Sequence, residues 1–173
     1  MKQTLKSIVP TPMLQFARDT YDAFRRLPQL PAAYLHPWRR ESIRRLAALK
    51  DIHKGKRAFV IGNGPSLRQT DLTKLRNEFT FGMNRIYLLF SEMGFSTSCL
   101  VSVNDLVLEQ CAGELRPLPL PKFITWRARH LFATDPQATF LDTDYTGQET
   151  FATDINGRVF EGFTVTYVAL QLA

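Results

Sequence analysis

Cysteine is scarce in this sequence: its 173 residues include two, Cys99 and Cys111. A disulfide-stapled miniprotein is therefore excluded, and without a secretory leader we expect reduced thiols in a cytoplasmic protein. No apolar run approaches the ~20 residues that a membrane-spanning helix needs. The histidines also fall into no metal-ligand spacing, so ordinary structural or exposed roles are expected for His36, His53 and His130.

Acidic residues are few at the start of the chain. Residues 1–57 carry 13 Lys or Arg against 4 Asp or Glu, whereas the other 116 residues carry 9 against 12. The net charge of +6 therefore belongs to an N-terminal arm, and the rest of the chain is mildly acidic. The arm has no groove-reading motif, zinc site or interleaved aromatics, so we expect no nucleic-acid partner.

The basic arm, residues 1–55, is predicted to be helical. One amphipathic helix is expected around residues 14–24, ending near Pro28, and a second from about Arg39 to Lys50. The second helix suits anionic lipid or an acidic partner, which indicates peripheral contact at the inner membrane face. Alternatively, its narrow apolar stripe packs on the domain that follows. Prolines separate the pieces of the arm: Pro10, Pro12, Pro28, Pro31 and Pro37.

Residues 56–173 read as a Rossmann-like nucleotide-binding domain. A buried apolar strand at residues 58–61 breaks into a glycine turn, and Ser66 or a neighbour then opens a helical stretch containing Leu67, Leu72 and Leu75. Further strands are predicted at 79–83, 100–103, 123–126 and 139–141. This succession predicts an α/β fold: an open, mostly parallel sheet with flanking helices. The final helix, from Thr164, has no stop signal, so we expect the domain to continue beyond Ala173.

Three predicted strands end in asparagine, at Asn63, Asn84 and Asn104. The carboxyl ends of parallel strands share one edge of a sheet, where ligands of open α/β folds bind. A carboxamide donates and accepts hydrogen bonds without charge, which suits ribose hydroxyls, base edges and phosphate oxygens. Gly62 and Gly64 allow close backbone approach, and the following helix offers free N–H groups to phosphate. Asparagine also tolerates left-handed turns, which is the structural alternative.

The glycine turn matches neither of the two common phosphate-binding motifs. It lacks the lysine and the spacing of a P-loop. It also departs from the dinucleotide fingerprint, because Leu67 stands at the third glycine position and Asn84 stands where an acidic ribose ligand is expected. We therefore expect neither a P-loop ATPase nor a nicotinamide-dependent oxidoreductase.

Four blocks of the sequence carry a family resemblance. They are residues 60–67 (VIGNGPSL), 83–85 (MNR), 103–105 (VND) and 162–167 (GFTVTY). Their succession resembles the MptE-like family, named for archaeal 6-hydroxymethylpterin diphosphokinase, which includes bacterial proteins associated with surface polysaccharide or flagellin modification. It is also similar to bacterial lipooligosaccharide sialyltransferases, whose GNGPSL turn and two later asparagines hold the CMP part of the donor. The resemblance covers about residues 56–173.

The resemblance implies a nucleotide-binding transferase that uses a nucleotide-activated sugar to modify a glycan or glycoprotein. The alternatives are a diphosphokinase that transfers diphosphate from ATP to a pterin, and a truncated, non-catalytic binding module. It implies no catalytic base here, because the sialyltransferase histidine lies downstream of the last helix. The sialyltransferases have Ser-Gly where this chain has Phe163-Thr164, which bears on CMP specificity. The implied nucleotide contacts are Gly62, Asn63, Gly64, Pro65, Ser66, Asn84, Asn104, Phe163 and Thr164.

A short acidic motif, Asp142-Thr143-Asp144, adds one metal hypothesis. Two carboxylates in this spacing can hold Mg²⁺, which would neutralise the diphosphate that a diphosphokinase transfers. A solvated strand end or turn explains the same residues without a metal. No cofactor is therefore expected for sugar transfer, and Mg²⁺ is expected only for the diphosphokinase alternative.

Overall fold

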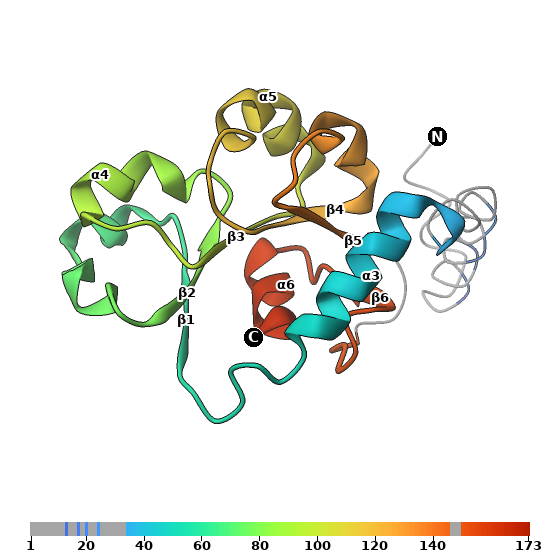
Figure 1. The fold of residues 1–173 in the computed structure, drawn as a ribbon, viewed down its shortest axis with the longest axis horizontal. Coiled ribbons are helices and arrows are strands. Elements are labelled where there is room, and N and C mark those ends of the chain that lie inside the picture. The colour runs from blue at the N-terminus through green and yellow to red at the C-terminus, as the bar shows by residue number, and fades with distance from the viewer. Residues whose placement is uncertain (1–12, 14–16, 18–19, 21–23, 25–33, 146–149) are drawn as a thin grey trace.

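The computed structural model describes residues 13, 17, 20, 24, 34–145 and 150–173, and most of the helix expected around residues 14–24 lies outside them. The described residues build a six-stranded, all-parallel sheet in which strand order equals chain order (Figure 1). This confirms the predicted α/β Rossmann-like fold. The strands are β1 Ala58–Ile61, β2 Phe79–Met83, β3 Cys99–Ser102, β4 Lys122–Thr125, β5 Ala138–Asp144 and β6 Arg158–Phe160.

The register brings the carboxyl ends of the first five strands close to one another. Each pairing continues to the last residue of the earlier strand, Ile61 with Gly82, Met83 with Val101, Ser102 with Ile124 and Thr125 with Leu141, and β5 then runs three residues further. β6 pairs with the final three residues of β5. The polar residues that follow these strands therefore emerge along one edge, which we call the carboxyl edge.

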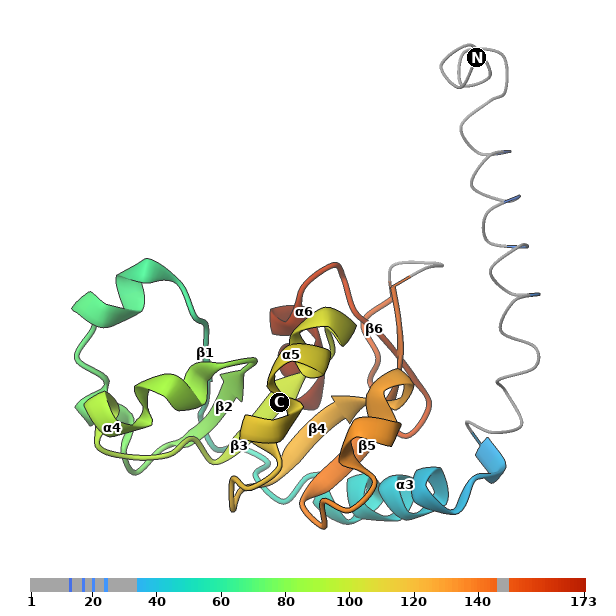
Figure 2. The same ribbon diagram turned by 90° about the horizontal axis from the view of Figure 1, so that it is seen from above.

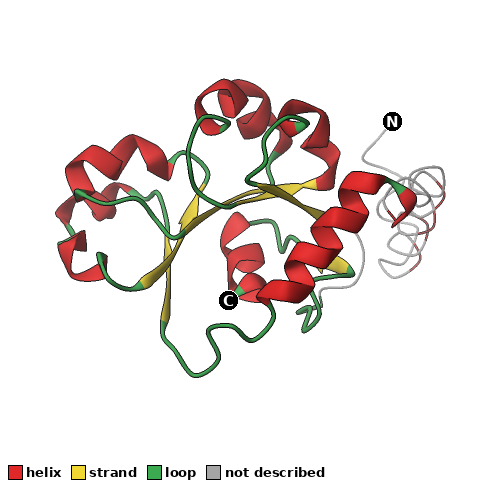
Figure 3. Cartoon of the chain, viewed as in Figure 1, coloured by secondary structure: helices red, strands yellow, loops and turns green. Residues whose placement is uncertain are grey.

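Helices cover both faces of the sheet (Figures 2 and 3). Because consecutive strands are neighbours, right-handed crossovers place the connections between β1 and β5 on one face. They contain the helices α4 Phe90–Met93 and α5 Asp105–Leu115 and four 3₁₀ helices: η3 Pro65–Gln69, η4 Leu72–Leu75, η5 Ile86–Leu89 and η6 Trp126–Phe132. Their apolar side chains pack with Leu100 and Ile124 in one core. The other core contains Val101 and Leu141 and is completed by α3 Pro37–Leu49 and α6 Val165–Leu172.

Helix α3 belongs to this second layer because its inner side bonds to β5. The Arg39 guanidinium is fully buried and donates from Nη1 to the Phe140 carbonyl at 2.8 Å. Ser42 Oγ accepts from the Phe140 N–H at 2.9 Å, and Leu46 lies in the core. The helix therefore packs on the domain that follows, as the alternative interpretation held, but through Arg39, Ser42 and Leu46. Of the predicted apolar stripe, Leu46 is buried, Ile43 is half-buried and Ala47 is exposed.

Three sequence predictions about local structure were wrong in detail. The helical stretch after Ser66 is two 3₁₀ helices, Pro65–Gln69 and Leu72–Leu75, because the Asp71 side chain caps the second one and starts it anew. Trp126 begins the 3₁₀ helix η6, Trp126–Phe132, and does not end β4, since Thr125 caps that helix. Strand β5 extends beyond 139–141 to Asp144, and β6 was not predicted at all.

Candidate functional site

Helices η3, η5, η6, α5 and α6 begin at the carboxyl edge. Gly64 precedes η3, Asn104 caps α5 and Thr164 caps α6. The first turn of a helix carries unpaired N–H groups and the positive end of the helix dipole, so this edge favours anions. The carboxyl edge is therefore the candidate site, and it contains all the nucleotide contacts that the sequence predicted.

The glycine turn after β1 is fixed by Asn63. Its Nδ2 donates to the carbonyl oxygen of Met83, the last residue of β2, at 2.9 Å. Because a carbonyl only accepts, the amide group of Asn63 is oriented unambiguously, and its Oδ1 remains available on an exposed side chain. A side chain on Gly62 would lie 3.4 Å from the Met83 methyl, so the turn packs closely against β2. Pro65 and Ser66 follow as exposed residues of η3.

Asn84 turns the chain at the end of β2. Its backbone is left-handed, with φ of 49°, a conformation that asparagine tolerates better than most residues. Its Oδ1 accepts from Ser102 Oγ at 3.0 Å, and its N–H donates to the Val101 carbonyl at 3.0 Å. Asn84 thus has a structural role, and its Nδ2 donor has no protein partner in the described part of the chain.

Asn104 combines a cap with an exposed donor. Its Oδ1 accepts from the Val107 N–H at 3.2 Å and thereby begins α5. Since that N–H can only donate, Oδ1 must face the helix and Nδ2 must face away from it. Asn104 is exposed, and no described residue bonds to Nδ2. The amide therefore presents a donor beside the N-terminus of α5.

Two residues with left-handed backbone conformation, Gly162 and Phe163, come directly before the cap of α6, at φ of 56° and 60°. A side chain at Gly162 would collide with the ring of Tyr167 at 2.7 Å, so glycine is required there. No comparable packing constraint explains the left-handed backbone of Phe163. Its side chain is 81% exposed, and its ring makes an edge contact with the ring of Phe160, with 6.3 Å between the centroids. An exposed aromatic held in a strained conformation is unusual and points to contact with a ligand.

The start of α6 lies beside the glycine turn, because Met83 contacts both. Thr166 Oγ1 is 3.5 Å from Met83 Sδ, and Asn63 bonds to the Met83 carbonyl. Thr164 accepts from the Thr166 N–H at 3.2 Å, which fixes the first turn of the helix. The structure therefore brings together the predicted residues from the β1 turn and from α6, although about 100 positions separate them in the sequence.

Arg127 connects the other strand ends. It follows β4 by two residues and donates to the Val103 carbonyl at 3.2 Å and to the Thr143 carbonyl at 3.0 Å. Its guanidinium also pairs with Asp105 at 2.9 Å and with Glu161 at 2.8 Å. One side chain thus joins the ends of β3, β4, β5 and β6. We call this group the arginine cluster.

The charges of the arginine cluster stabilise one another. Burial alone would lower the pKa of Arg127, but Glu161 and Asp105 outweigh burial, and the pKa is raised above its ordinary value. The guanidinium also lies over the ring of Tyr145, 5.2 Å from its centroid. Because both carboxylates are already bonded to Arg127, neither is a suitable catalytic base in this arrangement.

The acidic motif of β5 does not form a metal centre in the described residues. Asp144 pairs with Arg158 at 3.5 Å, and Asp142 accepts from the Tyr34 hydroxyl at 3.4 Å. Among the residues that the structure describes, no three His, Cys, Asp or Glu side chains gather closely enough to hold a metal ion. Both carboxylates are thus engaged by other side chains, the Mg²⁺ hypothesis stays a prediction, and we derive no step through the metal.

Neither a protein-family model nor a curated protein nor a solved structure matches this chain. The geometry of the carboxyl edge therefore carries the functional argument.

Sequence reasoning missed the arginine cluster. Its members lie far apart along the chain: Asp105 comes 22 positions before Arg127, and Glu161 comes 34 positions after it. The signal was present, because each residue follows the end of a buried strand by one to three positions. Applying the strand-end rule to charged residues as well as to asparagines would have found Asp105 and Arg127, but not Glu161, because β6 was not predicted.

Two further expectations can be compared with the structure. None of the helices that the structure describes has the length and apolar character of a membrane-spanning segment. Both cysteines are free and buried, and burial raises the pKa of the Cys99 thiol to about 12. Since reactivity requires the thiolate, Cys99 is inert at neutral pH.

Proposed function

We propose that the carboxyl edge binds a nucleotide and that the protein is a transferase that uses a nucleotide-activated sugar donor. The observation that carries this proposal is the convergence of the glycine turn with the capped starts of α5 and α6 at one edge. Helix N-termini and close backbone approach are the usual means by which α/β folds hold phosphate. The acceptor is proposed to be a glycan or glycoprotein.

The asparagines supply this edge with free hydrogen-bond donors and with a free acceptor. Asn84 and Asn104 each use Oδ1 for the fold and keep Nδ2 as a donor, whereas Asn63 uses Nδ2 and keeps Oδ1 as an acceptor. Donors suit phosphate oxygens, and an acceptor suits a ribose hydroxyl or an exocyclic amine. We therefore assign phosphate to the amide donors of Asn84 and Asn104 and to the backbone N–H groups of the glycine turn and of the helix starts, and ribose or base to Asn63 Oδ1 and the Phe163 ring.

The same groups would assist the transfer step. An acceptor hydroxyl attacks the anomeric carbon of the sugar, and the bond from that carbon to the phosphate oxygen breaks with its electron pair moving onto the phosphate. N–H groups and amide donors at the edge would stabilise this developing charge, because they are already oriented and need no reorganisation. The described residues include no base that we assign to the acceptor hydroxyl.

Replacing Asn104 with aspartate separates folding from binding. Asn104→Asp keeps the oxygen that caps α5, so we expect the unfolding free energy to change by less than ~0.5 kcal/mol. The free donor becomes a negative oxygen that repels phosphate, and nucleotide affinity should fall at least ~10-fold. Calorimetric titration with CMP, UDP and GDP donors, combined with urea unfolding, measures both effects.

Asn77→Asp is the matched control, because Asn77 is exposed and precedes β2 at the opposite edge of the sheet. It makes the same change of charge and should leave nucleotide affinity unchanged. Equal losses in the two variants would mean that overall charge governs binding. If none of the three donors binds to the wild-type protein, the proposal of a nucleotide-activated sugar donor is wrong.

Phe163 is expected to stack on the base of the nucleotide. Phe163→Asn removes the ring, and asparagine tolerates the left-handed backbone, so stability should change by less than ~1 kcal/mol. Loss of one stacking contact weakens nucleotide binding by about 5- to 100-fold. Phe163→Tyr keeps an aromatic ring and should therefore keep the wild-type affinity. Equal affinity of the two variants for the preferred donor would contradict the stacking role.

The diphosphokinase alternative makes a different prediction about products. It requires AMP to appear when the protein is mixed with ATP, 6-hydroxymethylpterin and Mg²⁺. The pairing of Asp144 with Arg158 offers no support for it, and we therefore prefer sugar transfer. Release of AMP in that assay, without binding of sugar nucleotides, would reverse this preference.

A further inference from the structure

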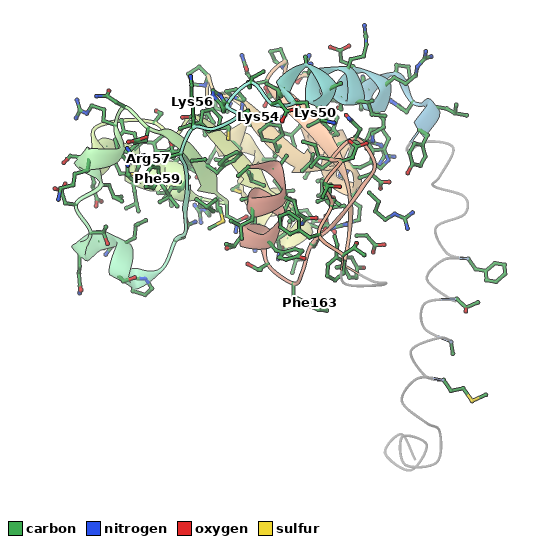
Figure 4. The ribbon with its side chains drawn as sticks, turned by 90° about the horizontal axis from the view of Figure 1, so that it is seen from below. Lys50, Lys54, Lys56, Arg57, Phe59 and Phe163 are labelled. Atoms are coloured by element: carbon green, nitrogen blue, oxygen red, sulfur yellow. The ribbon has the colours of Figure 1, made fainter. Side chains whose placement is uncertain are left out.

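A basic surface lies on the side of the molecule away from Phe163. It is formed by residues 50–57, which connect α3 to β1 and which we call the basic loop. Lys50, Lys54, Lys56 and Arg57 are all exposed, and Asp51 is the one acid among them. Figure 4 shows these four cations together at one side and Phe163 at the other.

The basic loop has a defined conformation. Its backbone makes successive turns, in which the Lys54 N–H donates to the Asp51 carbonyl at 3.0 Å and the Lys56 N–H donates to the His53 carbonyl at 2.9 Å. The ring of His53 packs on Phe79, with centroids 4.1 Å apart, and fastens the loop to the start of β2. The lysines therefore project from an anchored segment.

Three of the four cations are not committed to the fold. Arg57 pairs with Glu78 and lies over the ring of Phe59, 5.9 Å from its centroid. In the described part of the chain, no acidic side chain pairs with the lysines of the loop, Lys50, Lys54 and Lys56. Unpaired, exposed ammonium groups on one surface create a positive potential that attracts an anionic partner.

Apolar side chains accompany these lysines. Ile52 is 51% exposed, and Leu49, at the end of α3, is 40% exposed. An aliphatic side chain between cations gains little on the phosphate backbone of a nucleic acid, but it can enter the boundary between headgroups and acyl chains of a bilayer. Leu46 of α3 cannot serve this purpose, because it is buried against the sheet.

We propose that the basic loop docks the protein on an anionic lipid bilayer, with its lysines on the headgroups and Ile52 at their boundary with the acyl chains. In this orientation the carboxyl edge faces away from the bilayer and remains open to a soluble donor. The docking does not depend on a ligand at that edge, so it can be tested independently of the transferase proposal.

The test is vesicle co-sedimentation of the full chain with phosphatidylcholine vesicles and with mixed phosphatidylcholine and phosphatidylglycerol vesicles. We expect binding to the anionic vesicles, weakening as salt is added. Replacing Lys50, Lys54 and Lys56 with glutamine should weaken this binding about 100-fold, as the usual contribution of three cations near an anionic surface predicts. Ile52→Ser should also weaken vesicle binding relative to the wild type. The relative loss should be larger in high salt, where charge attraction is screened and the apolar contact contributes more of the affinity.

The matched control replaces three exposed cations elsewhere, Lys74, Arg76 and Arg116, with glutamine. It removes the same net charge and should bind anionic vesicles like the wild type. This comparison also accounts for the basic residues before residue 34, which both variants retain. Equal losses in the two triple variants, absence of vesicle binding by the wild type, or tighter binding to polyuridylate than to anionic vesicles would each overturn the proposal.

Discussion

Asp135→Asn should lower the unfolding free energy by about 3–5 kcal/mol, the usual cost of removing one partner from a buried ion pair. Asp135 Oδ2 lies 3.0 Å from Lys122 Nζ, and the two side chains are 1% and 0% exposed. Lys122 also donates to the Leu118 carbonyl at 2.7 Å, which does not neutralise its charge. The variant would leave an ammonium group buried at the start of β4. Urea unfolding followed by circular dichroism measures the loss.

Two further variants test this explanation. Lys122→Met combined with Asp135→Leu removes both charges and should recover most of the lost stability, because apolar groups of similar size need no counter-ion. Glu114→Gln breaks the pair of Glu114 with Arg85, whose side chains are 49% and 45% exposed, and should leave the unfolding midpoint unchanged. A midpoint for Asp135→Asn equal to that of the wild type would refute a structural role for the buried pair.

Arg127→Met should affect both stability and binding. It leaves Asp105 and Glu161 without their cation and the Val103 and Thr143 carbonyls without a donor, so we expect a loss of about 3 kcal/mol or more. The ends of four strands are no longer joined, and nucleotide affinity at the carboxyl edge should fall as well. Urea unfolding and calorimetric titration of the same preparations report the two effects.

Arg129→Met is the control for this prediction. Arg129 belongs to the same 3₁₀ helix, but it bonds to the Trp126 carbonyl and lies over the Trp126 ring. Arg129→Met should lower the unfolding free energy less than Arg127→Met does, and it should leave nucleotide affinity unchanged. Arg127→Lys should be intermediate, because one ammonium cannot reach two carboxylates and two carbonyls together. Unchanged affinity in Arg127→Met protein that remains folded would separate the arginine cluster from the binding site.

The central strands were predictable from the sequence because they are buried on both faces. β3 and β4 consist of buried residues throughout, and such strands read as continuous runs of mainly apolar residues. β6 gave no comparable signal, since its three residues begin with Arg158 and pair only with the last part of β5. The leucines after Ser66 indicated helix correctly, but their spacing could not show that Asp71 divides it into two short 3₁₀ helices.

The candidate site, like the fold, contains features that the sequence predicted and features that it did not. Asn63, Asn84 and Asn104 were predicted from their positions after strands, and the structure brings each of them to the carboxyl edge. Their division into free donors and a free acceptor was not predictable, because it depends on which backbone group each amide meets. The arginine cluster depends even more on assembly, since its members come from different strand ends.

The sequential strand order also has a consequence for how the chain folds during synthesis. Every strand after the first pairs with the strand made just before it. The sheet can therefore grow by one crossover and one strand at a time as the chain leaves the ribosome. The layer of α3 and α6 is different: Arg39 can bond to Phe140 only after 101 further positions are made, and α6, which contacts β1, β2 and β3, is made after all six strands. Until then Phe81, Val101 and Val103 remain uncovered. That face of the nascent sheet is where a chaperone would bind and where aggregation would begin.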